Sequence, residues 1–182
     1  MNRRAAIGMV VVGAIGVIVL GAVLVIGPGR GPLGGGQSLT VSGCEPKATS
    51  GSVVNVTLSD RGGAMMGGGS AMMVSLASVP DSVASGPVTF VATNTGALNH
   101  ELLVLPLPSD GAGTRPVGTD GKINEQSSLG EASTSCGRGP GDGISPGTRS
   151  WVTVNLAPGR YELLCDEPWH YANGMFAEFT VS

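Results

Sequence analysis

Short runs of alternating apolar and polar residues are the feature that most limits what this chain of 182 residues can fold into. In Ser150–Leu156, for example, Val152, Val154 and Leu156 point one way and the residues between them point the other. A period of two is typical of β-strands that bury one face. The runs span Val53–Leu58, Pro87–Asn94, His100–Leu107, Ser150–Leu156, Arg160–Cys165 and Met175–Val181. No segment after residue 38 keeps a helical period, so we expect an all-β fold.

Glycine and proline separate these runs, with 31 and 12 residues in the chain. About six to eight short strands divided by such turns are typical of an antiparallel β-sandwich or barrel. Two segments do not fit strands: Gly62–Met73 is expected to form a loop or loose hairpin, and Pro108–Gly147 a long insertion. A chain of this length has room for one ordinary domain and little more.

The N-terminal segment predicts a membrane anchor, because the 22 residues Ala5–Ile26 contain no charged side chain. A helix rises about 1.5 Å per residue, so this one would span roughly 33 Å, enough for a hydrocarbon core of about 30 Å. Arg3 and Arg4 precede it, and the positive-inside rule keeps that end in the cytoplasm. A cleaved signal peptide is the alternative, although no A-x-A-like site follows.

Three regions are therefore expected along the chain. Residues 1–26 form one N-terminal transmembrane helix or a signal peptide, residues 27–37 form a Gly/Pro-rich spacer, and residues 38–182 form the folded domain. Glycine and proline make the spacer unsuited to a helix or a packed core. We expect a single-pass protein of the cell membrane with its folded domain on the extracytoplasmic side.

The stretch "CDEPWHYANGM" contains one of three cysteines and one of two histidines. Alternation places Cys165 and Met175 on the inward faces of two neighbouring strands and Glu162 on an outward face. His170 lies on the loop between these strands, and His100, the other histidine, begins a separate strand. The sequence therefore predicts that a thiol, two imidazoles and a thioether meet at one end of the sandwich.

These four side chains are the ligands of a type 1 copper site, where two imidazoles and a thiolate form a plane and a thioether binds at longer range. Soft sulfur favours Cu(I) and imidazole also accepts Cu(II), so one rigid geometry can serve both states. Each residue alone has an ordinary interpretation: a buried cysteine as a small hydrophobe, a histidine at the surface, Met175 in the core. Their coincidence favours copper.

The pattern C-x4-H-x4-M in Cys165, His170 and Met175, with His100 upstream in "TNTGALNHELLVLPL", resembles the cupredoxin family, in particular its sulfocyanin and rusticyanin branch. The resemblance covers about Pro80–Ser182. It implies a Greek-key β-sandwich that binds one copper ion per chain and carries single electrons, with these four residues as ligands. One departure is Glu101, because many cupredoxins have Asn or Ser after the first histidine.

Other residues allow more than one interpretation. Cys44 and Cys136 remain after Cys165 is assigned to metal, and in an exported domain they suggest a disulfide, with two unpaired thiols as the alternative. The methionines of Gly62–Met73 are interpreted as gap fillers in a flexible loop, or as a Cu(I) site. Trp169 and Tyr171 flank His170 and form either a docking patch for a redox partner or ordinary packing.

The leading functional hypothesis is a membrane-tethered blue copper protein that passes electrons between extracytoplasmic redox partners, redox proteins of a respiratory chain. The alternative is an extracytoplasmic copper chaperone or storage module. An enzyme is not expected, because two histidines cannot supply the His-x-His clusters of a multicopper oxidase. Nucleic acid is not an expected partner either, since the net charge is -3 and the ten basic residues are scattered.

Overall fold

The computed structural model describes residues 45, 46, 51–61 and 73–182. Within them the chain forms ten β-strands and two short 3-10 helices, η1 (Glu125–Ser127) and η2 (Tyr171–Asn173), and no α-helix. None of these residues belongs to a helix long and apolar enough to span a bilayer. The predicted transmembrane helix, the spacer and Cys44 lie outside the described residues, so these predictions stay open.

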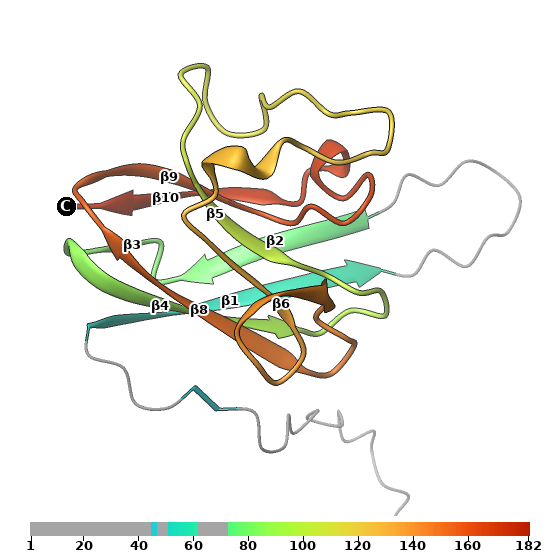
Figure 1. The fold of residues 1–182 in the computed structure, drawn as a ribbon, viewed down its shortest axis with the longest axis horizontal. Coiled ribbons are helices and arrows are strands. Elements are labelled where there is room, and N and C mark those ends of the chain that lie inside the picture. The colour runs from blue at the N-terminus through green and yellow to red at the C-terminus, as the bar shows by residue number, and fades with distance from the viewer. Residues whose placement is uncertain (1–44, 47–50, 62–72) are drawn as a thin grey trace, which may run out of the picture. The chain divides into compact units, whose positions relative to one another are not determined.

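The strands form two sheets (Figure 1). The four-stranded sheet has the order β2 (Met73–Val79), β1 (Ser52–Arg61), β4 (Gly86–Asn94) and β8 (Arg149–Leu156). The six-stranded sheet has the order β3 (Ser82–Val83), β10 (Phe176–Val181), β9 (Gly159–Leu164), β5 (Leu102–Pro106), β6 (Gly130–Thr134) and β7 (Gly139–Gly143). Most neighbours are antiparallel, and β1 with β4, β3 with β10, and β6 with β7 are parallel. The predicted all-β sandwich is confirmed.

Alternation explains the core between the sheets. In β1 the residues Val54, Val56 and Leu58 are buried, and the residues between them are exposed. Phe90 of β4 and Phe179 of β10 come from opposite sheets, and their rings meet edge to face with centroids 5.1 Å apart. Both rings are fully buried. Edge-to-face contact adds to the stabilisation that burial of the two rings provides, so this pair joins the two sheets across the core.

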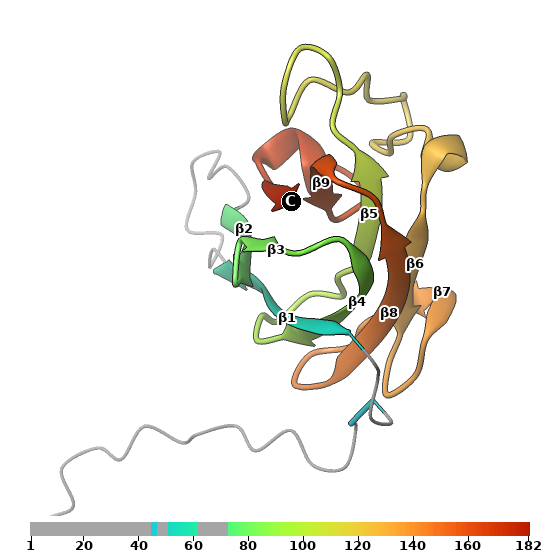
Figure 2. The same ribbon diagram turned by 90° about the vertical axis from the view of Figure 1, so that its left-hand side faces the viewer.

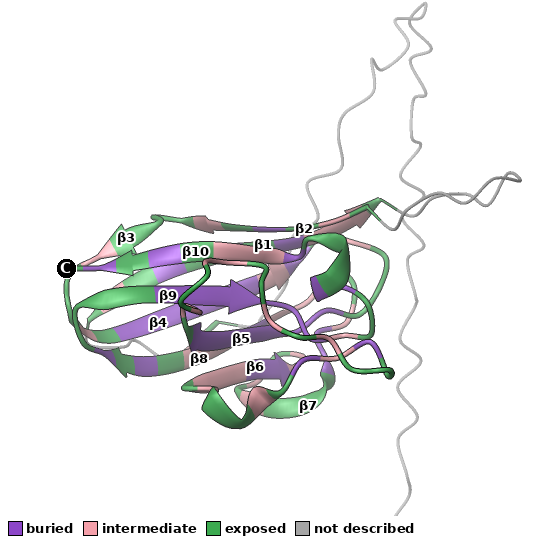
Figure 3. Cartoon of the chain, turned by 90° about the horizontal axis from the view of Figure 1, so that it is seen from above, coloured by how far each residue is buried: buried purple, intermediate pink, exposed green. Residues whose placement is uncertain are grey.

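The six-stranded sheet also buries part of its other face. In β9 the four residues from Tyr161 to Leu164 are all buried, and in β5 all but the last residue are buried (Figure 3). Segment 107–123 runs beside the loop after β9 (Figure 2). It covers a second apolar cluster that consists of Leu103, Leu105, Ile123, Leu164 and Tyr171. The expected outward position of Glu162 was therefore wrong, because that face is covered by chain rather than by water.

The ends of the expected strands lie within three residues of those of the observed β1, β4, β5, β8, β9 and β10. The strands β2, β3, β6 and β7 were not predicted from the sequence. Both β6 and β7 lie inside the expected insertion, and β7 has the sequence GPGDG, which offers no alternating apolar residues. Its strand conformation comes from pairing with β6 and not from a sequence pattern.

The aromatic pair between the sheets generates a test of stability. Replacing Phe90 by alanine removes a fully buried ring and leaves a cavity, so we expect the free energy of unfolding to fall by about 3–5 kcal/mol. The control is Val53→Ala, at a side chain 47% exposed in β1, which should cost less than about 1 kcal/mol. Urea unfolding of both variants measures this. Equal costs would contradict the assigned role of the pair.

Candidate metal centre

Each predicted ligand lies at the end of a strand of the six-stranded sheet or in the loop that joins two of its strands. His100 precedes β5, and its backbone exchanges hydrogen bonds with Ile144. Cys165 directly follows β9, His170 directly precedes η2, and Met175 directly precedes β10. Because β5, β9 and β10 are neighbours in one sheet, these ends meet although 75 positions separate the first ligand from the last.

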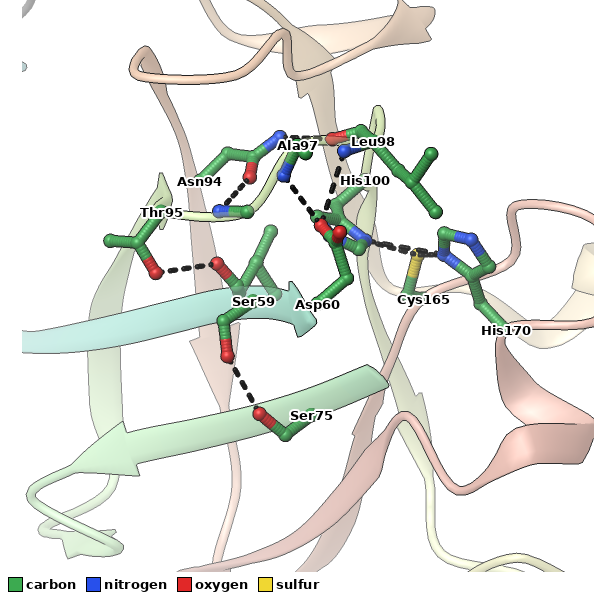
Figure 4. Close-up of polar contacts among 12 residues, drawn as sticks. Ser59, Asp60, Ser75, Asn94, Thr95, Ala97, Leu98, His100, Cys165 and His170 are labelled. Carbon is green, nitrogen blue, oxygen red and sulfur yellow. Dashed lines mark hydrogen bonds and ion pairs between the residues drawn. The ribbon is translucent and has the colours of Figure 1, made fainter. Parts of the chain in front are cut away.

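Three of the four side chains converge in space (Figure 4). The Nδ1 atoms of His100 and His170 lie 3.2 Å apart. The Sγ atom of Cys165 lies 3.3 Å from Nδ1 of His170 and 3.9 Å from Nδ1 of His100. Cys165 and His100 are fully buried, and His170 is 4% exposed. Two nitrogens and a sulfur are thus gathered at one buried point, a donor set that suits copper.

Met175 lies at the end of the loop that carries Cys165 and His170. Its backbone carbonyl accepts a hydrogen bond of 3.1 Å from the N–H of Cys165, and its own N–H donates to the carbonyl of His170 at 3.1 Å. The side chain is fully buried in the same apolar cluster as Cys165. The backbone therefore holds Met175 next to both neighbouring ligands, and its role as a fourth ligand stays a prediction.

Burial keeps the three donor groups neutral. It raises the pKa of the Cys165 thiol to about 12, although the backbone N–H of Glu101 donates to Sγ at 3.2 Å and opposes this shift. Burial also lowers the pKa of His170 to about 4, with a further contribution from His100, whose own pKa burial lowers as well. Both imidazoles are thus available as ligands at neutral pH. A soft metal ion can replace the thiol proton, which links binding to proton release.

Glu101, the departure from the family pattern, contacts Cys165 through its backbone. Its carboxylate is buried, and Oε2 makes no hydrogen bond with any described residue. Its backbone N–H instead reaches the Cys165 sulfur, so the hydrogen bond comes from the main chain, which any residue other than proline supplies. Burial raises the pKa of the Glu101 carboxyl to about 7, partly opposed by the nearby Lys122.

Asp166, beside the thiol, is buried as well. One carboxylate oxygen accepts a hydrogen bond of 2.7 Å from the N–H of Ile123, which ties segment 107–123 to the ligand loop. Burial raises the pKa of Asp166 to about 7. Glu167 is half-buried, and burial raises its pKa too. The carboxyl group of Asp166 is thus only partly ionised near neutral pH.

Two polar residues that sequence reasoning missed hold the loop before His100. Asn94, at the end of β4, donates from Nδ2 to the carbonyls of Leu98 and Ile144, each at 2.7 Å, and accepts from Gly96 N–H at 2.8 Å. Asp60, near the end of β1, accepts from Nε2 of His100 at 3.0 Å. The Asn94-Thr95-Gly96 turn was visible in the sequence. Asp60 had no such signal, because a charged residue near a strand end is usually at the surface.

A partly buried ion pair between Arg115 and Glu162 fixes the other side of the ligand loop. Glu162 is fully buried and accepts hydrogen bonds from Arg115 Nε at 2.6 Å, Gly113 N–H at 2.7 Å and the Tyr171 hydroxyl at 3.0 Å. The hydroxyl in turn accepts from the Arg115 N–H at 3.0 Å. Burial raises the pKa of Tyr171 to about 12, so it stays a donor. Because Tyr171 follows His170 directly, this network connects segment 107–123 to a ligand.

The remaining sequence predictions have mixed outcomes. Trp169 is 49% exposed beside His170, whereas Tyr171 is buried, so only the tryptophan is available at the surface. Met65, Met66 and Met72 lie outside the described residues, and Met73 begins β2. Cys44 also lies outside them, so its pairing with Cys136 stays a prediction.

The chain is similar to one protein family and to several solved structures. The model of the Sulfocyanin (SoxE) domain matches residues 76–182. Among solved structures, reduced auracyanin from Roseiflexus castenholzii is 23% identical over 56% of this chain and 82% of its own, with a TM-score of 0.42. Rusticyanin from Thiobacillus ferrooxidans is 20% identical over 79% and 89%, with a TM-score of 0.40. Auracyanin B is 18% identical over 78% and 95%, with a TM-score of 0.47. No curated protein sequence gives a match.

The Arg115–Glu162 ion pair generates a second test. Arg115→Met leaves the Glu162 charge buried without its cation, and we expect the apoprotein to lose about 3 kcal/mol of unfolding free energy. The matched control is Arg160→Met, which removes an arginine 62% exposed from its pair with Glu178 and should cost at most about 1 kcal/mol. Denaturant unfolding compares them. If Arg115→Met proved no more costly than Arg160→Met, the network would not hold the loop.

Proposed function

The chain belongs to the sulfocyanin family, a branch of the cupredoxins, and from this premise we propose that it carries single electrons through one copper ion held by His100, Cys165, His170 and Met175. The observation that supports this most directly is the convergence of two Nδ1 atoms and one Sγ atom within 4.8 Å at a buried point. Copper bound by such ligands alternates between Cu(I) and Cu(II). Electron transport, rather than catalysis, is the proposed activity.

The protein's own contribution is a site that changes little when the charge on the metal changes. His100 is held by a backbone bridge to Ile144 and by Asp60, and Cys165 by the N–H of Glu101. Backbone hydrogen bonds with Met175 close the loop that bears Cys165 and His170. Ligands held from several elements keep one geometry in both oxidation states. A fixed geometry lowers the cost of each electron transfer.

Electrons are proposed to enter and leave on the His170 side. His170 is the one ligand with measurable exposure among the four, at 4%, and its Nε2 makes no hydrogen bond with the described residues. Trp169 next to it is 49% exposed and Leu98, in the loop before His100, is 41% exposed. Exposed apolar side chains next to ligand-bearing loops are suited to brief contact with another protein. The proposed partners are redox proteins of a respiratory chain.

Copper binding can be tested on the purified chain with Cu(II). We expect one ion per chain and the intense visible absorption of a thiolate bound to Cu(II), which Cys165→Ser should abolish. Met175→Leu should alter the spectrum and raise the reduction potential, because a sulfur ligand is lost. Met73→Leu is the matched control, since Met73 is 60% exposed in β2 and should leave both unchanged. A colourless oxidised protein with bound copper would contradict the proposal.

We also propose that the copper domain is tethered to the extracytoplasmic face of the cell membrane. Support comes from the sequence: Arg3 and Arg4 precede the 22 uncharged residues Ala5–Ile26. The intact chain should be recovered in the membrane fraction with the mass of all 182 residues. A deletion of residues 5–26 should move it to the soluble fraction. A mature soluble form that begins after Ile26 would show cleavage instead of anchoring.

A further inference from the structure

The contact between Asp60 and His100 is a buried carboxylate–imidazole pair. Oδ2 of Asp60 lies 3.0 Å from Nε2 of His100, and the two side chains are 1% and 0% exposed (Figure 4). Asp60 lies near the end of β1 in the four-stranded sheet, whereas His100 leads into β5 of the other sheet. The pair thus spans the two sheets. It places a carboxylate directly behind one of the gathered donors.

This contact decides which nitrogen of His100 faces the other ligands. An ionised carboxylate has acceptor oxygens only, so Nε2 must carry the hydrogen. In a neutral ring Nδ1 then has its lone pair free, and Nδ1 is the atom that lies 3.2 Å from His170 Nδ1 and 3.9 Å from Cys165 Sγ. Oδ2 of Asp60 is the acceptor of two backbone N–H groups as well as the neighbour of Nε2 of His100. Three N–H donors gathered around one oxygen are the surroundings that suit an ionised carboxylate, which only accepts.

We propose that Asp60 is a positioning residue of the metal centre: it fixes the Nδ1 lone pair of His100 toward the metal and lends negative charge to that imidazole. The inference rests on the proposed copper function. A carboxylate that accepts from a ligand histidine makes the imidazole more basic. A more basic ligand stabilises Cu(II) more than Cu(I), so Asp60 lowers the reduction potential of the site.

The surroundings of Asp60 are arranged for this contact. The N–H groups of Ala97 and Leu98 also donate to Oδ2, at 2.8 and 3.1 Å. A Cβ atom on Gly96 would lie 1.8 Å from Oδ2, so only glycine lets the loop approach this closely. Within the described residues Oδ1 has no hydrogen-bond partner, and no arginine or lysine pairs with Asp60. The carboxylate charge is therefore directed toward His100 without a competing cation.

The substitution Asp60→Asn distinguishes this positioning role from a purely structural one. If Asp60 only anchored the loop, Asp60→Asn would keep an acceptor oxygen for Ala97 and Leu98 and would change little at the metal. If Asp60 acts through His100, the loss of charge must appear in the metal's properties. The matched control is Asp142→Asn, which removes the same charge from an exposed residue in the strand before Ile144.

The test uses the full chain in detergent, loaded with copper. We expect Asp60→Asn to weaken Cu(II) binding by about 10-fold to 100-fold, as loss of such outer partners does. At a fixed potential the ratio of oxidised to reduced protein should fall at least about tenfold, which is a rise of about 59 mV for a one-electron couple. Asp142→Asn should leave both quantities near the wild-type values. Equal effects of the two variants would overturn the inference.

A second measurement needs neither copper nor a variant. The chain has only two histidines, so nitrogen NMR of the histidine-labelled apoprotein can report the tautomer of each. Above the ordinary histidine pKa, we expect His100 to carry its hydrogen on Nε2. A hydrogen on Nδ1 would overturn the inference, even if Asp60→Asn failed to fold. If the wild type gave no type 1 spectrum, the proposed function would fail, and the apoprotein tautomer would still decide the role of Asp60.

Discussion

Burial of three metal-binding side chains at the end of an apolar core is the constraint on which the rest of this structure depends. Removing an imidazole or a thiol from water has a cost unless the group finds a partner. Here burial leaves the Cys165 thiol with a pKa of about 12 and His170 with one of about 4, so all three groups are neutral and aimed at one point. A soft cation bound there would satisfy all of them together.

The sandwich positions these groups from both of its sheets. β5 and β9 of one sheet deliver His100 and Cys165, and β1 of the other delivers Asp60 behind His100. On the far side, segment 107–123 covers the sheet and ties to the ligand loop through Glu162. A buried Arg–Glu pair is a weak source of net stability, yet removal of one partner is costly. Such a pair therefore serves to fix where the loop lies.

How much of the fold and of the candidate site could be predicted depended on how far apart in the sequence the interacting residues lie. Features that depend on neighbours in sequence could be predicted. Alternation predicted the strand faces of β1 and β8, and residue spacing predicted the ligand pattern around Cys165. Glu162 looked like a solvent-facing residue because its alternation with Tyr161 and Leu163 is local, whereas the segment that covers it lies 39 to 55 positions away. β7 was missed because GPGDG has no apolar residues to alternate.

The sequence by itself determined the all-β class, the core-facing residues of β1 and β8 and the four candidate ligands, because these follow from residue type and short spacing. Only the tertiary structure decided that Asp60 stands behind His100, that the Glu101 backbone rather than its side chain contacts Cys165, and that Glu162 is buried. The physical reason is that hydrogen bonding and desolvation depend on which distant segments meet. The residues around one position in the sequence do not show which distant residues will contact it in the fold.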